Sequence, residues 1–322
     1  MVGKSLFWKL SKRDHRLVYR WRMKHIITSQ QFDLKCINTI FAIATALEKK
    51  KDNTLKGKIM ASLFYEPSTR TRFSFESAML RLGGSVITTE NAKEFSSAAK
   101  GETLEDSIRV INNYADVIVL RHFEKGSAEK AAAVSNIPVI NAGDGTGQHP
   151  TQALLDLYTI KRALRRIEGL TIAMVGDLKN GRTVRSLSYL LAKYKGVKIY
   201  FVSPNGLQIG EDIKIYLAEQ RIDYEETDSL LSVIGSIDVL YQTRIQKERF
   251  ITQEEYAKYD KCYTIDRELV KKMKPKSIIM HPLPRVGEIL TEVDSCPQAM
   301  YFKQTYYGLL VRMALLKMIV KK

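Results

Sequence analysis

Residues 58–82 read KIMASLFYEPSTRTRFSFESAMLRL, in which an apolar run is followed by a polar turn and then by a second, amphipathic segment. The run 58–65 has the length and composition of a buried strand, whereas the apolar residues of 71–82 recur at helical spacing. Ser68–Arg72 lie where the strand turns into the helix, and the start of a helix presents unpaired backbone N–H groups. We therefore predict a strand–helix unit with donor groups at its joint.

The same order of strand and helix continues along the chain. Further strands are predicted at 85–88, 116–120, 137–140, 171–176, 198–202, 238–242 and 277–280. Helices are predicted at 71–82, 103–114, 127–135, 150–165, 183–193, 213–220, 228–234, 267–272 and 305–320. Strands that alternate with helices indicate parallel sheets with right-handed crossovers. The long helix that begins at Pro150 is the natural joint between two unlike α/β halves, and the polar loop 244–260 is a candidate lid.

Composition excludes several classes of protein. A chain of 322 residues with 45% hydrophobic residues can bury the cores of about two domains and is not disordered. No run of about 18 apolar residues is present, so no membrane span is predicted. Cys36, Cys262 and Cys296 are too few and too widely spaced for a disulfide scaffold, and no Cys-x-x-Cys pair offers a zinc site. We predict a protein of a reducing compartment, the cytoplasm.

The net charge of +16, from 51 Lys and Arg against 35 Asp and Glu, raises the question of nucleic-acid binding. Residues 1–24 alone carry +7, and on a helix their basic and apolar side chains separate to opposite sides. This arm is interpreted as a basic surface helix or targeting presequence, or as a solvated extension, which we favour. Outside it no cluster of basic and aromatic residues is present, which disfavours a nucleic-acid-binding protein.

Donor side chains follow six of the predicted strands. They lie in the segments 66–72, 121–122, 141–152, 177–183, 243–247 and 281–285. In open parallel sheets ligands bind outside the carboxyl ends of the strands, so these segments are expected to meet. Because the segments are rich in Arg, His and hydroxyl groups and poor in acids, the predicted ligands are anions.

Two of these segments indicate particular chemistry. Ser68–Thr71 combine hydroxyls, free N–H groups and Arg70, a set suited to phosphate, although a simple helix cap with an Arg72–Glu76 pair explains the same residues. The glycines of 143–147 let the backbone approach a ligand closely, and His149 then opens a helix. A neutral imidazole there can donate one hydrogen bond, while the alternative is an ordinary loop histidine.

The segments 66–72, 149–152, 176–183, 243–249 and 281–285 resemble, in this order, signature segments of the aspartate/ornithine carbamoyltransferase family. The resemblance covers about residues 24–320. His281-Pro282-Leu283-Pro284-Arg285 and the loop from Ser96 to Thr103 are similar to catalytic chains of the aspartate enzymes rather than the ornithine enzymes. The implied fold class is α/β, with two doubly wound parallel-sheet domains joined by long helices and an active site at the strand ends between them.

The resemblance also implies domain limits. They are a basic extension at 1–23, a carbamoyl phosphate-binding domain at 24–166 on which a helix at 305–322 packs back, and an aspartate-binding domain at 167–304.

By resemblance, site residues can be assigned one by one. Carbamoyl phosphate is bound by Ser68, Thr69, Arg70, Thr71, Ser96, Lys100, Arg121, His149, Gln152, Leu283 and Pro284. Aspartate is bound by Lys100, Arg182, Arg244 and Gln246. The catalytic set is Arg70, Thr71, Arg121 and His149, and the family has a cis bond before the position of Pro284. Glu66 is expected to bridge to Arg182 and Arg249 when the domains close. No metal and no cofactor are implied.

The implied activity is transfer of a carbamoyl group from carbamoyl phosphate to L-aspartate, in pyrimidine biosynthesis. The implied assembly is a homotrimer in which Ser96 and Lys100 enter a neighbour's site; a regulatory chain is left open. The alternatives are a carbamoyltransferase acting on ornithine or another amine, a catalytically dead homologue, and the disfavoured nucleic-acid-binding protein.

Overall fold

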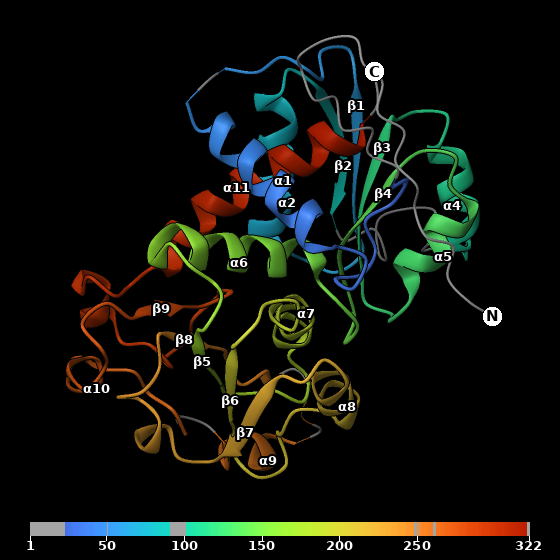
Figure 1. The fold of residues 1–322 in the computed structure, drawn as a ribbon. Helices are drawn as coiled ribbons and strands as arrows, with labels where there is room; N and C mark the ends of the chain where they lie inside the picture. The colour runs from blue at the N-terminus through green and yellow to red at the C-terminus, as the bar shows by residue number, and fades with distance from the viewer. Residues whose placement is uncertain are drawn as a thin grey trace.

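The fold is taken from a computed structural model, which describes residues 23–49, 51–90, 101–247, 250, 252–259 and 262–320 (Figure 1). Its first sheet is built from four parallel strands in the order β2-β1-β3-β4. These strands are β1 (Ile59–Phe64), β2 (Ser85–Glu90), β3 (Val117–His122) and β4 (Val139–Asp144). β2 is therefore an edge strand, and β1 and β3 are central.

The second sheet holds five parallel strands in the order β7-β6-β5-β8-β9. They are β5 (Thr171–Val175), β6 (Lys198–Val202), β7 (Asp223–Thr227), β8 (Val239–Gln242) and β9 (Ile278–Met280). In Figure 1 the first sheet lies above the long helix α6 (Pro150–Leu164) and the second lies below it.

Helices cover both faces of each sheet. The first half carries α1 (Leu34–Leu47), α2 (Thr69–Arg81), α4 (Leu104–Ile111) and α5 (Ser127–Val134). The second carries α7 (Arg182–Leu191), α8 (Glu211–Glu219), α9 (Gln253–Ala257), α10 (Arg267–Lys271) and the short 3₁₀ segments η2 (Leu230–Ser232) and η4 (Thr291–Ser295). α11 (Tyr301–Ile319) packs against α1, α2 and α6.

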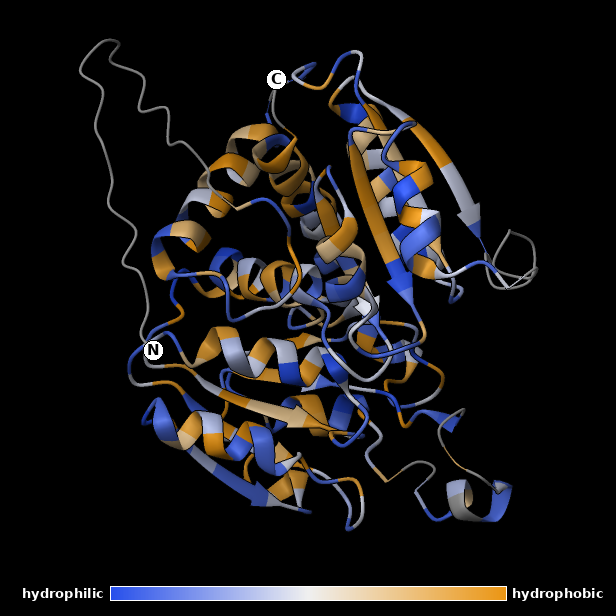
Figure 2. Cartoon of the chain, turned by 90° about the vertical axis from the view of Figure 1, so that its right-hand side faces the viewer, coloured by the Kyte–Doolittle hydropathy of each residue, from blue (hydrophilic) through white to orange (hydrophobic). Residues whose placement is uncertain are grey.

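Successive side chains along a strand point to opposite faces of the sheet, which explains why helices cover both faces. In β1, Met60 and Phe64 join the core beneath α1 and α2, whereas Ala61 and Leu63 join a separate core with residues of α4 and α5. In Figure 2 hydrophobic colour runs along several of the strands and over much of the helices. The predicted α/β class with two parallel-sheet domains is confirmed, while the exact domain limits stay a prediction.

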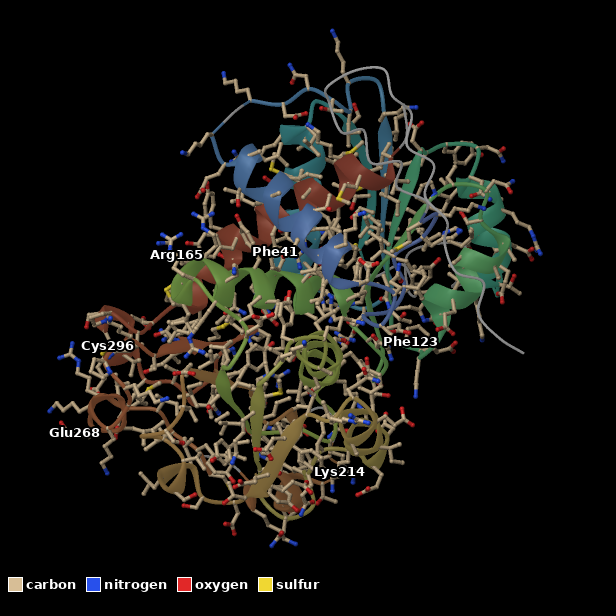
Figure 3. All side chains as sticks on the ribbon, in the orientation of Figure 1. Phe41, Phe123, Arg165, Lys214, Glu268 and Cys296 are labelled. Atoms are coloured by element: carbon tan, nitrogen blue, oxygen red, sulfur yellow. The ribbon has the colours of Figure 1, made fainter. Side chains whose placement is uncertain are left out.

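α6 connects the two halves. Every residue from Pro150 to Ile160 is buried, and the helix contacts both α7 and α11. Phe41 of α1, labelled in Figure 3, lies with its ring centroid 5.1 Å from that of Tyr158 on α6. A helix buried on all sides is stabilised by the elements on both of its flanks, so it holds the halves against each other.

Several elements differ from the predictions. β7 is absent from the predicted set because Asp223–Thr227 is an edge strand with three exposed acidic side chains and no apolar run. α1 lies before the segments to which elements were assigned, and Asp33 caps it by accepting from the Cys36 N–H. The predicted helix 228–234 is only the 3₁₀ turn η2, and the predicted loop 244–260 contains α9. The basic arm lies outside the described residues, apart from Met23 and Lys24.

Candidate active site

A cavity of about 420 Å³ lies between the two halves. All six predicted strand-end segments contribute to its wall. Its lining includes Glu66–Thr71 after β1, Arg121 in β3, His149 and Gln152 at the start of α6, Gly181–Thr183 at the start of α7, Thr243, Arg244 and Gln246 after β8, and His281–Pro284 after β9. Parallel strands therefore deliver their carboxyl ends to one place, as open α/β sheets do.

The start of α2 forms one wall of the cavity. Ser68 is the N-cap residue, but its hydroxyl makes no capping hydrogen bond. Thr71, in the first turn, is buried against the cavity. Arg72 turns the other way, with its Nη2 atom 2.9 Å from Glu90 and its Nε atom 3.9 Å from Glu76. The Arg72–Glu76 pair thus exists beside the cavity wall, and Ser68–Thr71 line the cavity at the start of the helix, where anions commonly bind.

Glu66 joins arginines from both halves. Its Oε2 atom lies 3.1 Å from Nη2 of Arg121 and 3.3 Å from Nη1 of Arg182. Arg182 also donates to the carbonyl of Gly145 at 2.8 Å. Gly143 has a φ of 116°, and a Cβ there would lie 3.2 Å from both the Arg121 Nη1 and the Arg182 Cζ atoms. The glycine stretch therefore lets two arginine side chains come close to the backbone. The sequence had predicted that a ligand would approach the backbone there.

His149 is held as a neutral group. Its ring is buried, and among the described residues its Nδ1 atom has no hydrogen-bond partner. Burial lowers the pKa of His149 well below the ordinary 6.5, and the charges of Arg182, Arg121 and Arg312 lower it further. A neutral imidazole beside three guanidinium groups can donate one hydrogen bond to a ligand without adding charge.

The cavity is strongly cationic. Its lining holds Arg70, Arg121, Arg182, Arg244 and Arg312, and among the described lining residues Glu66 is the one carboxylate. Burial lowers the pKa of Arg70, and the neighbouring Arg244 lowers it further. Guanidinium groups converge here at the cost of mutual repulsion, which a bound anion would relieve.

The segment after β9 closes the far side. Leu283 and Pro284 line the cavity, and the peptide bond between them is cis. His281 accepts the Leu283 N–H at its Nδ1 atom, 2.7 Å away, and its Nε2 atom lies 2.7 Å from Glu288 Oε1. These hydrogen bonds orient the backbone that lines the cavity.

Most residues assigned from the sequence meet at this cavity. Those that line it are Glu66, Ser68, Thr69, Arg70, Thr71, Arg121, His149, Gln152, Arg182, Arg244, Gln246, Leu283 and Pro284. Ser96, Lys100 and Arg249 lie outside the described residues.

Five lining residues were not predicted: Ser74, Leu155, Gln304, Thr305 and Arg312. Arg312 could have been noticed in the sequence, because it interrupts an otherwise apolar run. In the structure its Nη1 atom donates to the Ser74 hydroxyl at 2.8 Å.

In the part of the chain that is described, no group of three or more His, Cys, Asp or Glu side chains could hold a metal ion. The described helices include none that is long and apolar enough to cross a membrane.

Comparison with known proteins gives a consistent result. A family model described as "Aspartate/ornithine carbamoyltransferase, carbamoyl-P binding domain" matches residues 24–162, and one described as "Aspartate/ornithine carbamoyltransferase, Asp/Orn binding domain" matches residues 168–319. The chain is 55% identical to aspartate carbamoyltransferase 3, chloroplastic, of Pisum sativum, over 94% of this chain and 78% of the relative. It is 53% identical to the aspartate carbamoyltransferase catalytic subunit of Methanocaldococcus jannaschii, over 93% and 98%.

Two solved structures extend the comparison to the fold. The M. jannaschii aspartate transcarbamoylase catalytic subunit superposes with a TM-score of 0.86 at 53% identity, covering 92% of this chain and 98% of that one. Aspartate transcarbamoylase from Trypanosoma cruzi, in complex with N-(phosphonacetyl)-L-aspartic acid, gives a TM-score of 0.88 at 42% identity, covering 92% and 96%.

Proposed function

Since the chain belongs to the aspartate/ornithine carbamoyltransferase family, we propose that it transfers the carbamoyl group of carbamoyl phosphate to the amine of L-aspartate. The products are N-carbamoyl-L-aspartate and phosphate, in pyrimidine biosynthesis. The observation that carries the proposal is a cavity that Ser68–Thr71 line together with Arg182 and Arg244 of the other half. Relatives that are 53–55% identical over more than nine-tenths of this chain are named aspartate carbamoyltransferases, which favours aspartate over ornithine as the acceptor.

The first half of the cavity suits carbamoyl phosphate. The N–H groups at the start of α2, the hydroxyls of Ser68 and Thr69, and Arg70 bind the phosphate. Arg121, Thr71 and neutral His149 donate toward the carbonyl oxygen, which becomes an oxyanion when the amine attacks. Donors placed at a developing oxyanion are worth about 3 kcal/mol each in comparable sites.

The second half suits a dicarboxylate amine. Arg182, Arg244 and Gln246 bind the two carboxylates of aspartate and hold its amine toward the carbamoyl carbon. The amine forms a bond to that carbon, the bond from carbon to phosphate oxygen breaks, and the departing phosphate takes the amine proton. No protein nucleophile is needed, so a lining of donors is sufficient for the reaction.

We further propose a homotrimer with shared sites, in which Ser96 and Lys100 of one subunit enter the site of a neighbour. Three features support an assembly: β2 is an edge strand of its sheet, Phe73 and Leu80 of α2 are 55% and 60% exposed, and the M. jannaschii relative is named a subunit. When inactive Lys100→Ala and Arg70→Ala chains are mixed and reassembled, hybrid particles should regain part of the activity. A monomer on sedimentation, or no recovery, would contradict the shared site.

The cytoplasm is our proposal for the compartment. The three cysteines are free, which suits a reducing environment, although the names of the plant relatives place those proteins in the chloroplast. Imaging of the full chain with and without residues 1–23 tests the location and the role of the arm together.

The activity is tested by a product assay with two acceptors. With carbamoyl phosphate present, the purified chain should form N-carbamoyl-L-aspartate from aspartate and no citrulline from ornithine. Arg244→Ala should lower kcat/KM for aspartate by about 100-fold, through the loss of a charged hydrogen bond to a carboxylate. Arg267→Ala on the surface of the same half is the matched control and should leave the rate unchanged. Citrulline as the main product would establish the ornithine alternative.

A further inference from the structure

Asp156 is a fully buried carboxylate that the mechanism above does not use. It lies on α6, one helical turn after Gln152, with 0% of its surface exposed. Its Oδ1 atom accepts from the amide Nε2 atoms of Gln152 at 2.8 Å and of Gln304 at 2.6 Å. Its Oδ2 atom accepts from the Tyr241 hydroxyl at 2.7 Å. Three donors thus converge on one carboxylate directly behind the cavity.

This contact decides how the Gln152 amide can meet a ligand. The Oδ1 atom of Asp156 accepts the hydrogen bond from the Gln152 Nε2 atom, so the carboxyl group holds the NH₂ end of the amide. The amide oxygen of Gln152 is then the atom left for the cavity, which Gln152 lines. A carbamoyl group presents an NH₂ donor and therefore needs an acceptor at this point.

The same carboxylate connects three walls of the cavity. Tyr241 belongs to β8, the strand that leads to Arg244, and Gln304 belongs to α11. The Oε1 atom of Gln304 accepts the backbone N–H of His281 at 3.1 Å, at the start of the segment that carries Leu283 and Pro284. The position of Gln152 is therefore set by contacts from both halves of the molecule.

The contacts of Asp156 oppose the effect of burial on its carboxyl group. Burial raises the pKa of Asp156, and the hydrogen bonds from Tyr241, Gln304 and Gln152 and the charge of Arg312 limit the rise, so that the pKa is about 7. Replacing this carboxylate by an apolar side chain would leave both glutamine amides without their acceptor.

We propose that Asp156 is a positioning residue that selects the carbamoyl group by fixing the Gln152 amide with its oxygen toward the cavity. The inference rests on the proposed function, because it assigns the carbamoyl NH₂ to this point of the site. It predicts discrimination between carbamoyl phosphate and acetyl phosphate, which carries a methyl group in place of the NH₂ group.

The test is a calorimetric titration of the full-length chain with carbamoyl phosphate, acetyl phosphate and inorganic phosphate. Wild-type protein should bind carbamoyl phosphate about tenfold more tightly than acetyl phosphate, the value of one hydrogen bond inside a buried site. Asp156→Leu should bring this ratio to about one, with phosphate affinity changed by less than about twofold. Asp156→Ala is measured beside it, since the smaller side chain avoids overpacking.

Two further variants separate positioning from general stability. Asp156→Asn should keep most of the ratio, because its amide oxygen can accept from both glutamines and its NH₂ can donate to the Tyr241 hydroxyl, which then turns. Thr159→Val is the matched control on α6, since it removes the buried hydrogen bond from Thr159 to the Leu155 carbonyl (2.7 Å) and should leave the ratio unchanged.

The outcomes are distinguishable. A folded Asp156→Leu or Asp156→Ala protein that keeps the wild-type ratio, or one that weakens all three ligands equally, would overturn the inference. A wild-type protein that binds both acyl phosphates equally would overturn it too. A wild-type protein that fails to bind carbamoyl phosphate would instead defeat the proposed function.

Discussion

Glu66 is the residue on which the two halves of the cavity meet. Its carboxylate contacts Arg121 of β3 and Arg182 of α7, so it neutralises part of the charge that Arg182 presents to an acceptor and fixes the guanidinium in place. Charged hydrogen bonds of this partly buried kind are stronger than neutral ones. Glu66 is therefore expected to affect the acceptor side of the reaction most.

Glu66→Gln should raise the aspartate concentration for half-saturation by about tenfold, because Arg182 loses its charged partner and domain closure loses a bridge. The half-saturation for carbamoyl phosphate should change less. Steady-state kinetics with each substrate varied in turn measures both. Glu90→Gln is the matched control, since Glu90 pairs with Arg72 outside the cavity lining. Unchanged aspartate saturation in Glu66→Gln would contradict the bridging role.

At this scale the sequence was informative wherever site residues follow a strand directly. Ser68–Thr71, Arg121 and Arg244 could be predicted because a strand end fixes where the next side chains lie. Asp156, Gln304 and Arg312 could not, since they reach the site only when α6 and α11 pack together, a long-range contact without local pattern. His149 was expected to be neutral because it starts a helix, whereas burial and three arginines supply the effect.

At the scale of elements, the segment after β9 is held by hydrogen bonds to one side chain, that of Glu288. Glu288 accepts from His281 at 2.7 Å and from the N–H groups of Val286 and Gly287 at 2.9 and 3.0 Å. Burial raises the pKa of Glu288, but the hydrogen bonds from His281 and Val286 outweigh it and bring the pKa to about 2. The folded state therefore favours the ionised carboxylate.

Glu288→Gln should lower the free energy of unfolding at pH 7 by about 1–3 kcal/mol, since the amide cannot accept all of these hydrogen bonds as an anion does. The pKa is depressed from 4.5, so the stabilisation is fully present above pH 4.5 and is lost as the pH falls toward 2. Urea unfolding of both proteins at pH 7, 4 and 3 checks this. Glu268→Gln, at an exposed site on α10 labelled in Figure 3, should change little. A pH-independent difference for Glu288→Gln would contradict the assignment.

Apolar sequence patterns predicted some elements well and failed for others. Buried parallel strands such as β5 and β6 are apolar runs and were predicted close to their observed limits. β7 could not be recognised because its acidic side chains are paired across the surface, as Lys198 with Glu225 and Lys214 with Glu226. The predicted helix 228–234 was wrong, since η2 completes only a 3₁₀ turn before Val233 and Ile234 enter the core.

The whole molecule is two parallel sheets whose carboxyl ends meet beside α6. This arrangement brings segments that lie far apart in the sequence into one cavity, with Ser68–Thr71 on one side and Arg182 and Arg244 on the other. Most of the net charge of +16 is unrelated to that chemistry, because few of the basic residues line the cavity. We therefore expect the function to depend on where the five lining arginines lie rather than on the total charge.

The central claim is that one cavity binds both substrates at once, and a bisubstrate ligand tests it directly. Calorimetric titration with N-(phosphonacetyl)-L-aspartic acid should give one site per chain, with affinity lowered by about 100-fold in both Arg70→Ala and Arg244→Ala, the arginines on opposite sides of the cavity. A ligand that binds wild-type protein equally well when either arginine is removed, or that does not bind at all, would contradict the account.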